Sequence, residues 1–300
     1  MLFGAPSDAF NIMIDTIDFL DIEPPVVPPR SRLYSLAPIG VQTPMVESVT
    51  SYLVRLAEAH CFPTWVLMVK ELAPFFKRQS MVTATGHSDF FGRTGASFNG
   101  GNETGRELFS ILERLTLRPN LQKMSLLQCN KIFSQRGLIS EKQRWCPECL
   151  SEWAGNRETA YYPLLWNIIP VALCFVHKTP LLASCPTCEA SHRPFSWYAS
   201  IGRCPKCKSS LFAGGVARAE CNEAWPLFAT DLIAELLNFL QNTQELPRSK
   251  FPQNISFLVE KLFAGNEKAF NRFTRLSRSN VKVWIQASQL PTLSSLLTLA

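Results

Sequence analysis

The chain has 300 residues, of which 46% are hydrophobic and 18% charged, and a formal net charge of +6 at pH 7. This length and apolar content allow about two or three small domains with cores of their own. No apolar run reaches the roughly 18 residues of a membrane-spanning helix, and the first residues lack the basic leader of a secretory signal. We therefore expect a cytoplasmic protein whose ten cysteines are metal ligands or core thiols rather than disulfides.

Charge is distributed unevenly along the chain. Residues 1–30 carry five acidic side chains against one arginine, whereas residues 248–282 carry eight Lys or Arg against two Glu. We expect an acidic arm and a basic C-terminal part that faces a polyanion, the alternative being a solvated charged face. An amphipathic stretch precedes the proline-rich "PPVVPPR", which predicts either a partner-binding tether or an arm that packs on its own body. The candidate partner-binding residues are Phe10, Ile12, Met13, Ile17, Phe19 and Leu20.

The segment from 43 to 76 predicts two helices separated by "CFPT". Thr43 followed by Pro44 is typical of a helix start. Two apolar stripes at helical spacing follow, and they predict a helix-turn-helix unit or a plain helical hairpin. The first stripe is Val49, Tyr52, Leu53, Leu56 and Ala57, and the second is Trp65, Val66, Val69, Leu72 and Phe76. Six glycines between 86 and 105 then predict a flexible loop, after which "ELFSILERLTLRP" resumes a helical pattern.

Eight Cys and His residues form two four-ligand sets in the centre of the chain. In each set two pairs with two intervening residues can face one another and close a tetrahedron around a metal ion. Thiolate and imidazole donors favour zinc, and neither set leaves a coordination position open, so we expect two structural Zn²⁺ ions per chain. The first set is Cys146, Cys149, Cys174 and His177, and the second is Cys185, Cys188, Cys204 and Cys207.

Other uses of these thiols have less support. A redox pair needs a thioredoxin-like βαβ unit, which the pattern around the cysteines does not predict, whereas an iron–sulfur cluster on the second set stays open. A nucleobase deaminase needs His-x-Glu, which is absent here. Outside the two sets, we expect Cys61, Cys129 and Cys221 to be buried thiols, His60 and His87 to be capping or surface residues, and His192 to be a minor candidate ligand.

Helical patterns return at 226–242, 254–264, 266–276 and 280–299. The stretch "KAFNRFTRLSRSNVKVWIQASQLP" predicts a helix-turn-helix, with a turn at Ser277 and Arg278, an inward face of Val281, Trp284 and Ile285, and a further helix from Pro291. In repressor-type domains the second helix enters the major groove, while a protein-docking helical bundle is the alternative. The candidate DNA-binding residues are Arg272, Arg275 and Arg278, mainly for phosphates, and Ser279, Asn280, Lys282 and Gln286, for base edges or phosphates.

These elements predict a mainly α fold with small zinc-ribbon β-hairpins. We expect four segments along the chain. They are an acidic arm and linker at 1–36, a helical domain containing a helix-turn-helix at 37–143, a tandem zinc-finger domain at 144–212, and a C-terminal helical domain with a helix-turn-helix at 213–300.

The ordered run "RWCPECL", "YYPLLWNIIPVALCFVHKTPLLASCPTC" and "GRCPKCKSSL", preceded by "ESVTSYLVRLAEAH", resembles the TniQ/TnsD family of transposon target-selection proteins over about residues 38 to 212. The resemblance implies an N-terminal helix-turn-helix domain joined to zinc fingers, with the eight residues of the two sets as ligands. Phe175 departs from the pattern, since proline often follows the third cysteine. Members select insertion sites for Tn-seven-like and CRISPR-associated transposons and recruit the AAA+ ATPase TnsC, which brings the transposase.

The resemblance and the basic C-terminal helices favour a non-enzymatic selector that binds double-stranded attachment-site DNA, on the nucleoid, and recruits TnsC. Within the family, the alternative is a bridge between a CRISPR guide-RNA effector complex and TnsC. Outside it, the alternative is a zinc-dependent helix-turn-helix transcription regulator. A zinc hydrolase is disfavoured by the closed ligand sets and by the lack of a Ser/His/Asp set, a P-loop or paired carboxylates. We therefore expect neither an enzyme nor a membrane partner.

Overall fold

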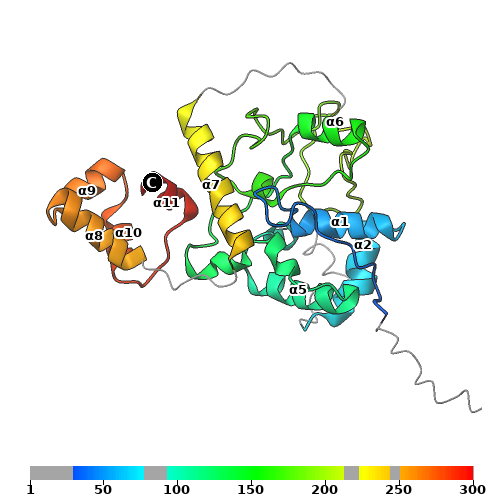
Figure 1. Ribbon diagram of the computed structural model, residues 1–300, viewed down its shortest axis with the longest axis horizontal. Coiled ribbons are helices and arrows are strands. Elements are labelled where there is room, and N and C mark those ends of the chain that lie inside the picture. Colours follow the sequence, from blue (N-terminus) through cyan, green and yellow to red (C-terminus); the bar gives the residue numbers. More distant parts are fainter. Residues whose placement is uncertain (1–29, 78–92, 213–222, 244–250, 300) are drawn as a thin grey trace, which may run out of the picture. The chain divides into compact units, whose positions relative to one another are not determined.

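The structure, a computed structural model, describes residues 30–77, 93–212, 223–243 and 251–299. It divides into two compact units, Met1–Arg30 and Ser31–Ala300. Helices dominate the second unit, and the β-structure of the described residues consists of isolated bridges, which confirms the mainly α fold (Figure 1). No described helix has the length and apolar character needed to cross a membrane.

The helices are labelled in chain order, with α for α-helices and η for 3-10 or π segments. They are α1 (Val49–Ala59), α2 (Thr64–Val66), η1 (Leu67–Leu72), η2 (Ala73–Phe75), α4 (Arg93–Ser97), α5 (Glu103–Thr116), η4 (Leu121–Met124), η5 (Leu127–Lys131), α6 (Pro147–Gly155), η6 (Leu164–Asn167), α7 (Ala224–Asn242), α8 (Phe251–Phe263), α9 (Glu267–Thr274), α10 (Arg278–Ile285) and α11 (Leu293–Leu299).

Helix α1 begins at Val49 because the Ser48 hydroxyl accepts a hydrogen bond from the backbone amide of Ser51. The predicted start at Thr43 is wrong. Residues 46–48 are instead held in extended backbone pairing with residues 162–164, which prevents an earlier helical turn. The predicted apolar stripe of α1 is confirmed, since all five of its side chains are buried.

The second predicted helix is built differently from its pattern. It starts as α2 and continues as the π-helix η1, whose hydrogen bonds span five residues rather than four. A π turn holds more residues than an α turn, so the face that meets the core shifts along the chain. Leu72 and Phe76 of the predicted stripe are buried, as predicted, and Trp65 packs partly buried against the core. The prediction is wrong for Val66 and Val69, which are only half-buried, whereas Leu67 and Met68 are fully buried.

Part of the predicted glycine-rich loop is helical. Residues 86–92 lie outside the described residues, but α4 follows directly, and the Asn102 side chain caps α5 by accepting a hydrogen bond from the Gly105 amide at 2.6 Å. The side-chain amide of Asn99 donates a hydrogen bond to the Thr50 hydroxyl at 2.9 Å, which fastens the connection between α4 and α5 to α1. The loop prediction is therefore wrong for this part, because local polar contacts order it.

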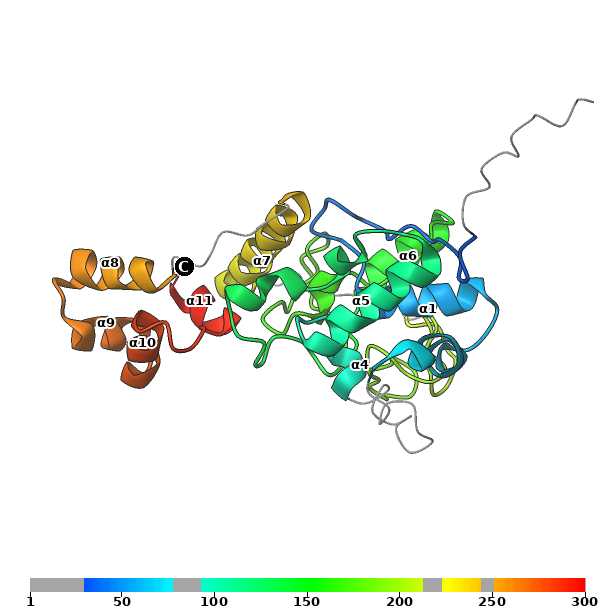
Figure 2. The same ribbon diagram turned by 90° about the horizontal axis from the view of Figure 1, so that it is seen from below.

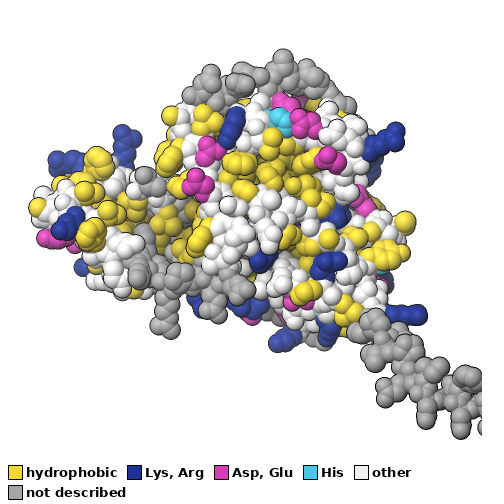
Figure 3. All heavy atoms as spheres, viewed as in Figure 1, with side chains coloured by type: hydrophobic (Ala, Val, Ile, Leu, Met, Phe, Trp, Pro, Cys, Tyr) yellow, Lys and Arg dark blue, Asp and Glu magenta, His cyan; other side chains and the backbone are white. Residues whose placement is uncertain are grey.

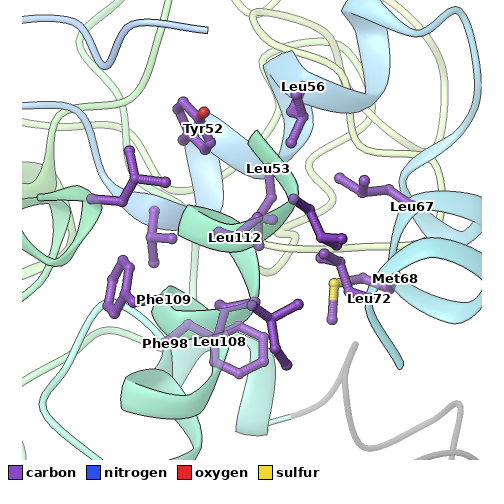
Figure 4. Packing of buried hydrophobic residues seen from close by; sticks show 14 of the residues in the cluster. Tyr52, Leu53, Leu56, Leu67, Met68, Leu72, Phe98, Leu108, Phe109 and Leu112 are labelled. Atoms are coloured by element: carbon purple, nitrogen blue, oxygen red, sulfur yellow. The ribbon is translucent and has the colours of Figure 1, made fainter. Parts of the chain in front are cut away.

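Helices α1 and α5 and the π-helix η1 share one hydrophobic core (Figure 4). Tyr52 and Leu53 of α1 are fully buried there with Leu108 and Leu112 of α5. Phe195, from the loop between the two Cys pairs of the second metal set, is fully buried in the same core. The zinc-finger segment and the N-terminal helical segment are thus packed against each other.

A second core crosses two of the predicted domain limits. Side chains of α7 and α11, from the C-terminal segment, pack with Phe133 and Leu138 of the N-terminal segment and with Leu164 of the zinc-finger segment. Both views show α7 alongside this part of the chain (Figures 1 and 2). The predicted domain boundaries at residues 143 and 212 therefore do not separate independent hydrophobic cores.

The predicted arm also ends earlier than expected. The first compact unit stops at Arg30 rather than at residue 36. Leu33 is buried in the core of α1 and α5, and its backbone amide donates to the Leu115 carbonyl at 2.9 Å. These contacts assign residues 31–36 to the second unit.

Helices α8, α9 and α10 pack on one another around Phe270, Val281 and Trp284 (Figure 2). This confirms the predicted inward positions of Val281 and Trp284. Helix α9 ends at Thr274, and Ser277 caps α10 by accepting a hydrogen bond from the Asn280 amide at 3.2 Å. Helix α10 therefore starts at Arg278, which the sequence had placed in the turn.

The predicted helix at 280–299 is two helices, α10 and α11. Thr292, rather than Pro291, heads α11, because its hydroxyl accepts a hydrogen bond from the Ser295 amide at 3.2 Å. The chain just before α11 is fixed to the rest of the second unit, since the Ser134 amide donates to the Pro291 carbonyl at 2.7 Å.

Gly40 has a backbone conformation that favours glycine. Its φ is +65°, and a Cβ added to it would lie 2.4 Å from the Met45 carbonyl oxygen. We expect Gly40→Ala to lower the free energy of unfolding, measured by urea denaturation, by at least about 1–2 kcal/mol, the cost of left-handed backbone for a residue with a Cβ. Gly155→Ala is the control, because no atom lies within 4 Å of its Cβ position and its φ is not positive. Equal losses in the two variants would contradict this explanation.

Candidate metal centres

The first predicted ligand set comes together in the structure. The ligand atoms of Cys146, Cys149, Cys174 and His177 all lie within 4.8 Å of one another. The Cys149 and Cys174 sulfurs are 3.6 Å apart, and Nδ1 of His177 is 3.3 Å from the Cys149 sulfur and 3.5 Å from the Cys146 sulfur. A tetrahedral ion about 2.3 Å from sulfur and about 2.0 Å from nitrogen places its ligand atoms about 3.5–3.8 Å apart. The geometry therefore fits a four-coordinate metal ion.

The second set is assembled in the same way. The ligand atoms of Cys185, Cys188, Cys204 and Cys207 also lie within 4.8 Å of one another, and the sulfur distances Cys185–Cys207 and Cys188–Cys204 are both 3.7 Å. Cys185 and Cys204 are buried, whereas Cys207 is exposed. This centre is thus the more open of the two.

A helix start and a tight turn present the four ligands of the first set. Cys146 caps α6 and Pro147 occupies the first helical turn, so that Cys149 follows about one turn later on the same side. Cys174 and His177 lie on a turn closed by backbone hydrogen bonds, from the Lys178 amide to the Cys174 carbonyl at 2.9 Å and from the Cys174 amide to the Thr179 carbonyl at 2.8 Å.

The same turn recurs at both pairs of the second set. The Glu189 amide donates to the Cys185 carbonyl and the Lys208 amide to the Cys204 carbonyl, each at 2.9 Å. In all three turns the residue after the second ligand has a left-handed backbone, with φ of 54° at Lys178, 58° at Glu189 and 64° at Lys208. Two facing turns therefore build the second centre, as the spacing predicts, whereas the first centre combines one turn with a helix.

The pKa values of two thiols in the first centre are shifted in opposite directions. Hydrogen bonds with the Cys146 and Cys149 thiols lower the pKa of Cys174 to about 3, while the pKa of Cys149 is raised by hydrogen bonds with Cys146 and Cys174. Burial lowers the pKa of His177, but the hydrogen bond to Glu152 and the interactions with Cys146 and with the Glu152 charge together outweigh burial, and the net shift of the pKa is upward. The three thiols therefore titrate as one coupled group.

Glu152 contacts the ring nitrogen of His177 that does not face the sulfurs. Its carboxylate lies 2.9 Å from Nε2 of His177, while Nδ1 of the same ring faces the three sulfurs. A carboxylate that accepts the second ring N–H fixes the tautomer and orientation of a metal-bound histidine. The spacing of the ligands gave no sign of Glu152, which sits on α6 and meets His177 only through the fold.

We expect Glu152→Ala to weaken metal binding at the first centre by about 10- to 100-fold, the usual cost of losing such a partner. Competition with a colorimetric chelator measures this affinity. Glu189→Ala is the control, because Glu189 is an exposed acid that follows a ligand of the second centre and belongs to neither ligand set. An unchanged affinity in Glu152→Ala, or an equal loss in both variants, would contradict the role of Glu152.

The isolated cysteines differ from one another. Cys129 is fully buried, as predicted, and burial raises its pKa to about 12. Cys61 is exposed, so the prediction of a buried thiol is wrong there. It lies in the break after α1 with φ 57°, where the chain turns away from the core. Cys221 lies outside the described residues.

Two histidines outside the ligand sets, His60 and His192, make contacts that do not involve a metal centre. His60 caps the end of α1 and accepts a hydrogen bond from the Tyr34 amide at 3.0 Å, which confirms the predicted capping role. His192 stacks on Trp145 with ring centroids 5.3 Å apart and belongs to neither ligand set. Its candidacy as a substitute ligand is therefore wrong, because both sets are complete without it. His87 lies outside the described residues.

Sequence reasoning also missed a half-buried arginine beside the first centre. Arg144 donates to the carbonyls of Ile168 at 2.6 Å and Val171 at 2.5 Å, and burial lowers its pKa to about 10. These bonds hold the segment that leads to Cys174. Arg144 precedes Trp145 and Cys146 in the chain, but nothing in its local pattern indicates partners about 25 residues away.

All seven candidate DNA-binding residues are exposed. At about 100° per residue, Arg278, Lys282 and Gln286 share one face of α10, turned away from the buried Val281 and Trp284. Basic side chains are visible over α8, α9 and α10 (Figure 3). Asn280 lies outside this face, since it lines a cavity of about 500 Å³ together with Trp284. The candidate partner-binding residues of the arm, Phe10, Ile12, Met13, Ile17, Phe19 and Leu20, lie outside the described residues.

Comparison with known families matches part of the chain to a family. Residues 38–181 match the sequence model of the TniQ family, described as TniQ. The match spans α1 to η6 and all four ligands of the first centre, and it ends before Cys185. No curated protein sequence matches the chain. The chain therefore carries a TniQ domain, the domain of a transposition-associated family, at residues 38–181.

Proposed function

We propose that this protein is a non-enzymatic target-site selector for DNA transposition, which binds attachment-site DNA and recruits the ATPase TnsC. The observation that carries the DNA-binding part is the exposed face of α10, with Arg278, Lys282 and Gln286 side by side. Val281 and Trp284 anchor the opposite side of the helix in the core of α8 and α9. A short helix that is anchored on one side and basic on the other suits the major groove.

The two kinds of predicted contact contribute differently to this function. Arg272 and Arg275, on or next to α9, would neutralise phosphates, which supplies affinity that falls with salt. Lys282 and Gln286 would contact base edges, where a good contact contributes about 1–3 kcal/mol of discrimination. Recruitment of TnsC is proposed from the family, with the apolar arm as its candidate tether.

We propose zinc as the ion in both centres. Three or four thiolates in tetrahedral arrangement are the donors that zinc prefers, and four protein ligands leave no position for a water or a substrate. The ions would therefore stabilise the fold, and no catalytic step is assigned to them.

Footprinting on attachment-site DNA and on random DNA, with and without TnsC and ATP, tests the proposed function. We expect a discrete footprint from the protein alone, lost in the double variant Lys282→Ala and Gln286→Ala. The control is the double variant Lys142→Ala and Gln122→Ala, which removes an exposed lysine and an exposed glutamine from other parts of the chain. A footprint that survives the α10 variant, or that disappears in the control, would contradict the assignment.

The second candidate function is a bridge between TnsC and a CRISPR guide-RNA effector complex. It predicts no footprint alone but co-assembly with TnsC on DNA. Binding to an operator as a dimer, with no response to TnsC, would instead indicate a transcription regulator. Deleting residues 1–24 tests the tether separately, since full TnsC binding without the arm would contradict it.

A further inference from the structure

Helix α7 carries large apolar side chains on a face that it does not bury in the core. Its buried residues, such as Ile233 and Leu237, pack in the core that α7 shares with α11. At about 100° per residue, a second row of apolar side chains lies next to this buried face and follows the helix along its length. This row, which we call the α7 stripe, consists of Trp225, Phe228, Leu232, Leu236 and Phe239.

The three aromatic side chains of the α7 stripe are left in water. Trp225 is 54% exposed, Phe228 is 42% exposed and Phe239 is 53% exposed, while the two leucines are half-buried at the edge of the core. Three side chains of about 150–250 Å² each therefore leave roughly 300 Å² of apolar surface exposed on one helix. An exposed apolar patch of roughly this size is often a binding site. We propose that the α7 stripe binds a basic amphipathic helix of a partner protein.

The charge beside the α7 stripe is negative. The helix contains two acidic residues and no Lys or Arg, in a chain whose net charge is +6. Asp231 is paired with Lys178 at 2.6 Å, whereas Glu235 is exposed and forms no ion pair within the part of the chain that the structure describes. Glu235 lies three residues after Leu232 and four before Phe239, so it is next to both on the helix surface. Hydrophobic and acidic side chains lie close together along α7 (Figure 3), which suits a partner with Lys or Arg beside its apolar face.

The helix is held in place before any partner binds. The ion pair of Asp231 with Lys178 connects its first half to the turn of the first metal centre. At its other end the Lys123 ammonium donates to the Gln241 carbonyl at 2.7 Å, and the Gln241 side-chain amide donates to the Lys123 carbonyl at 2.8 Å. A pre-organised surface loses little conformational entropy on binding, so more of the apolar burial contributes to affinity.

A helix is the partner that fits the shape of the α7 stripe. The stripe extends from Trp225 to Phe239, a length of about 21 Å. Its members are separated by 3, 4, 4 and 3 residues, the spacing of the apolar seam between paired helices. The backbone groups within α7 are bonded to one another, so an extended strand cannot pair with them, whereas the side-chain rows of a second helix can pack along the stripe.

Charge disfavours the other occupants of the α7 stripe. Residues 1–30 include apolar side chains, but they carry five acidic residues against one arginine. The same helix from a second copy of the chain would bring acids against acids. A membrane surface of anionic lipids repels an acidic helix in the same way. The inference uses neither α10 nor the apolar arm, so it does not rest on the proposed function.

Fluorescence anisotropy tests the inference with the full chain and two labelled synthetic peptides of about 18 residues. Both peptides carry leucines at helical spacing, flanked by lysines in the basic peptide and by glutamates in the acidic one. We expect the basic peptide to bind at least about 10-fold more tightly than the acidic peptide at low salt. The double variant Trp225→Gln and Phe239→Gln should weaken binding of the basic peptide by about 10-fold or more. Glutamine is chosen because it is a good helix former.

A charge reversal tests the proposed sign of the partner. Glu235→Lys should weaken binding of the basic peptide and strengthen binding of the acidic one, each by about 2- to 10-fold. Phe257→Gln and Glu260→Lys on α8 are the controls, because Phe257 is 59% exposed and Glu260 is also exposed. The inference is overturned by equal losses in the control variants, by equal affinity for the two peptides, or by a double variant that binds the basic peptide like the unaltered protein.

Two further measurements separate the other occupants. Deleting residues 1–24 should leave the affinity for the basic peptide unchanged, and sedimentation should give the same oligomeric state with and without Trp225→Gln. A several-fold rise in affinity after the deletion would place the acidic arm on the α7 stripe. A dimer that dissociates in Trp225→Gln would place a second copy of the chain there. Either result overturns the inference.

Discussion

Replacing Cys174 with serine is expected to release the metal ion of the first centre and to unfold the structure around it. Cys174 is fully buried, and its cluster includes Trp145, Trp166 and Tyr162. Structural zinc contributes about 10–16 kcal/mol to folding in zinc-finger peptides. That is as large as the roughly 5–15 kcal/mol by which whole domains are stable, so we expect that the apolar contacts around Cys174 do not compensate for loss of the metal.

Metal analysis and thermal melting measure this result. We expect the Cys174→Ser variant to hold one ion per chain where the two complete ligand sets hold two, and to melt at a much lower temperature. Cys61→Ser is the control, since Cys61 is exposed and lies outside both sets. A Cys174→Ser protein that keeps both ions, or that loses one without any loss of stability, would contradict a structural role for the first centre.

The ligand sets could be predicted from the sequence because ligation restricts both residue type and spacing. Each pair must fit on one turn, and only a few turns present two ligands to one ion. The form of each turn was less predictable. Pro147 favours a helix start after Cys146, so this part of the first centre could be predicted. The residue after His177 has a positive φ but is a lysine, and only a glycine there would have indicated a left-handed backbone from the sequence.

What the sequence did not predict depends on contacts between distant residues. The shift in the buried face at Leu67 and Met68 follows from a π-helix, which apolar spacing read with an α period cannot detect. The shared core of α7, α11 and Phe133 was missed for a related reason, since each segment shows an apolar face but not the face it meets. The local sequence pattern therefore predicts the helices well, but it does not predict which segments pack against one another.

Glu47→Ala is expected to be the most destabilising substitution outside the metal centres. The Glu47 side chain is fully buried and that of Arg55 is 11% exposed, with 2.6 Å between their charged atoms. The Glu47 carboxylate also accepts hydrogen bonds from the Ser51 hydroxyl at 2.9 Å and from the Ile39 amide at 3.3 Å. Truncation would leave the Arg55 charge buried without its partner, which costs about 3–5 kcal/mol.

An ion pair at the surface of the same protein provides the control. Arg32 and Glu71 lie 2.7 Å apart, close to the distance in the buried pair, but their side chains are 57% and 23% exposed. Water can solvate the arginine after Glu71→Ala, so we expect that variant to lose only about 0.2–1 kcal/mol. The comparison isolates burial, because the chemistry and the distance are nearly the same.

Urea denaturation of the single variants and of the double variant Glu47→Ala with Arg55→Ala measures the coupling of the buried pair. We expect the double variant to lose less free energy of unfolding than the sum of the two single variants, because removing both charges leaves neither of them unpaired. Metal content should stay at the unaltered level in all of them, since neither residue is a ligand. Two results would contradict this role: additive losses of unfolding free energy in the double variant, or equal losses for Glu47→Ala and Glu71→Ala. Either result would show that the Glu47 carboxylate contributes no more than a surface acid. The start of α1 would then be held by its backbone pairing with residues 162–164 alone.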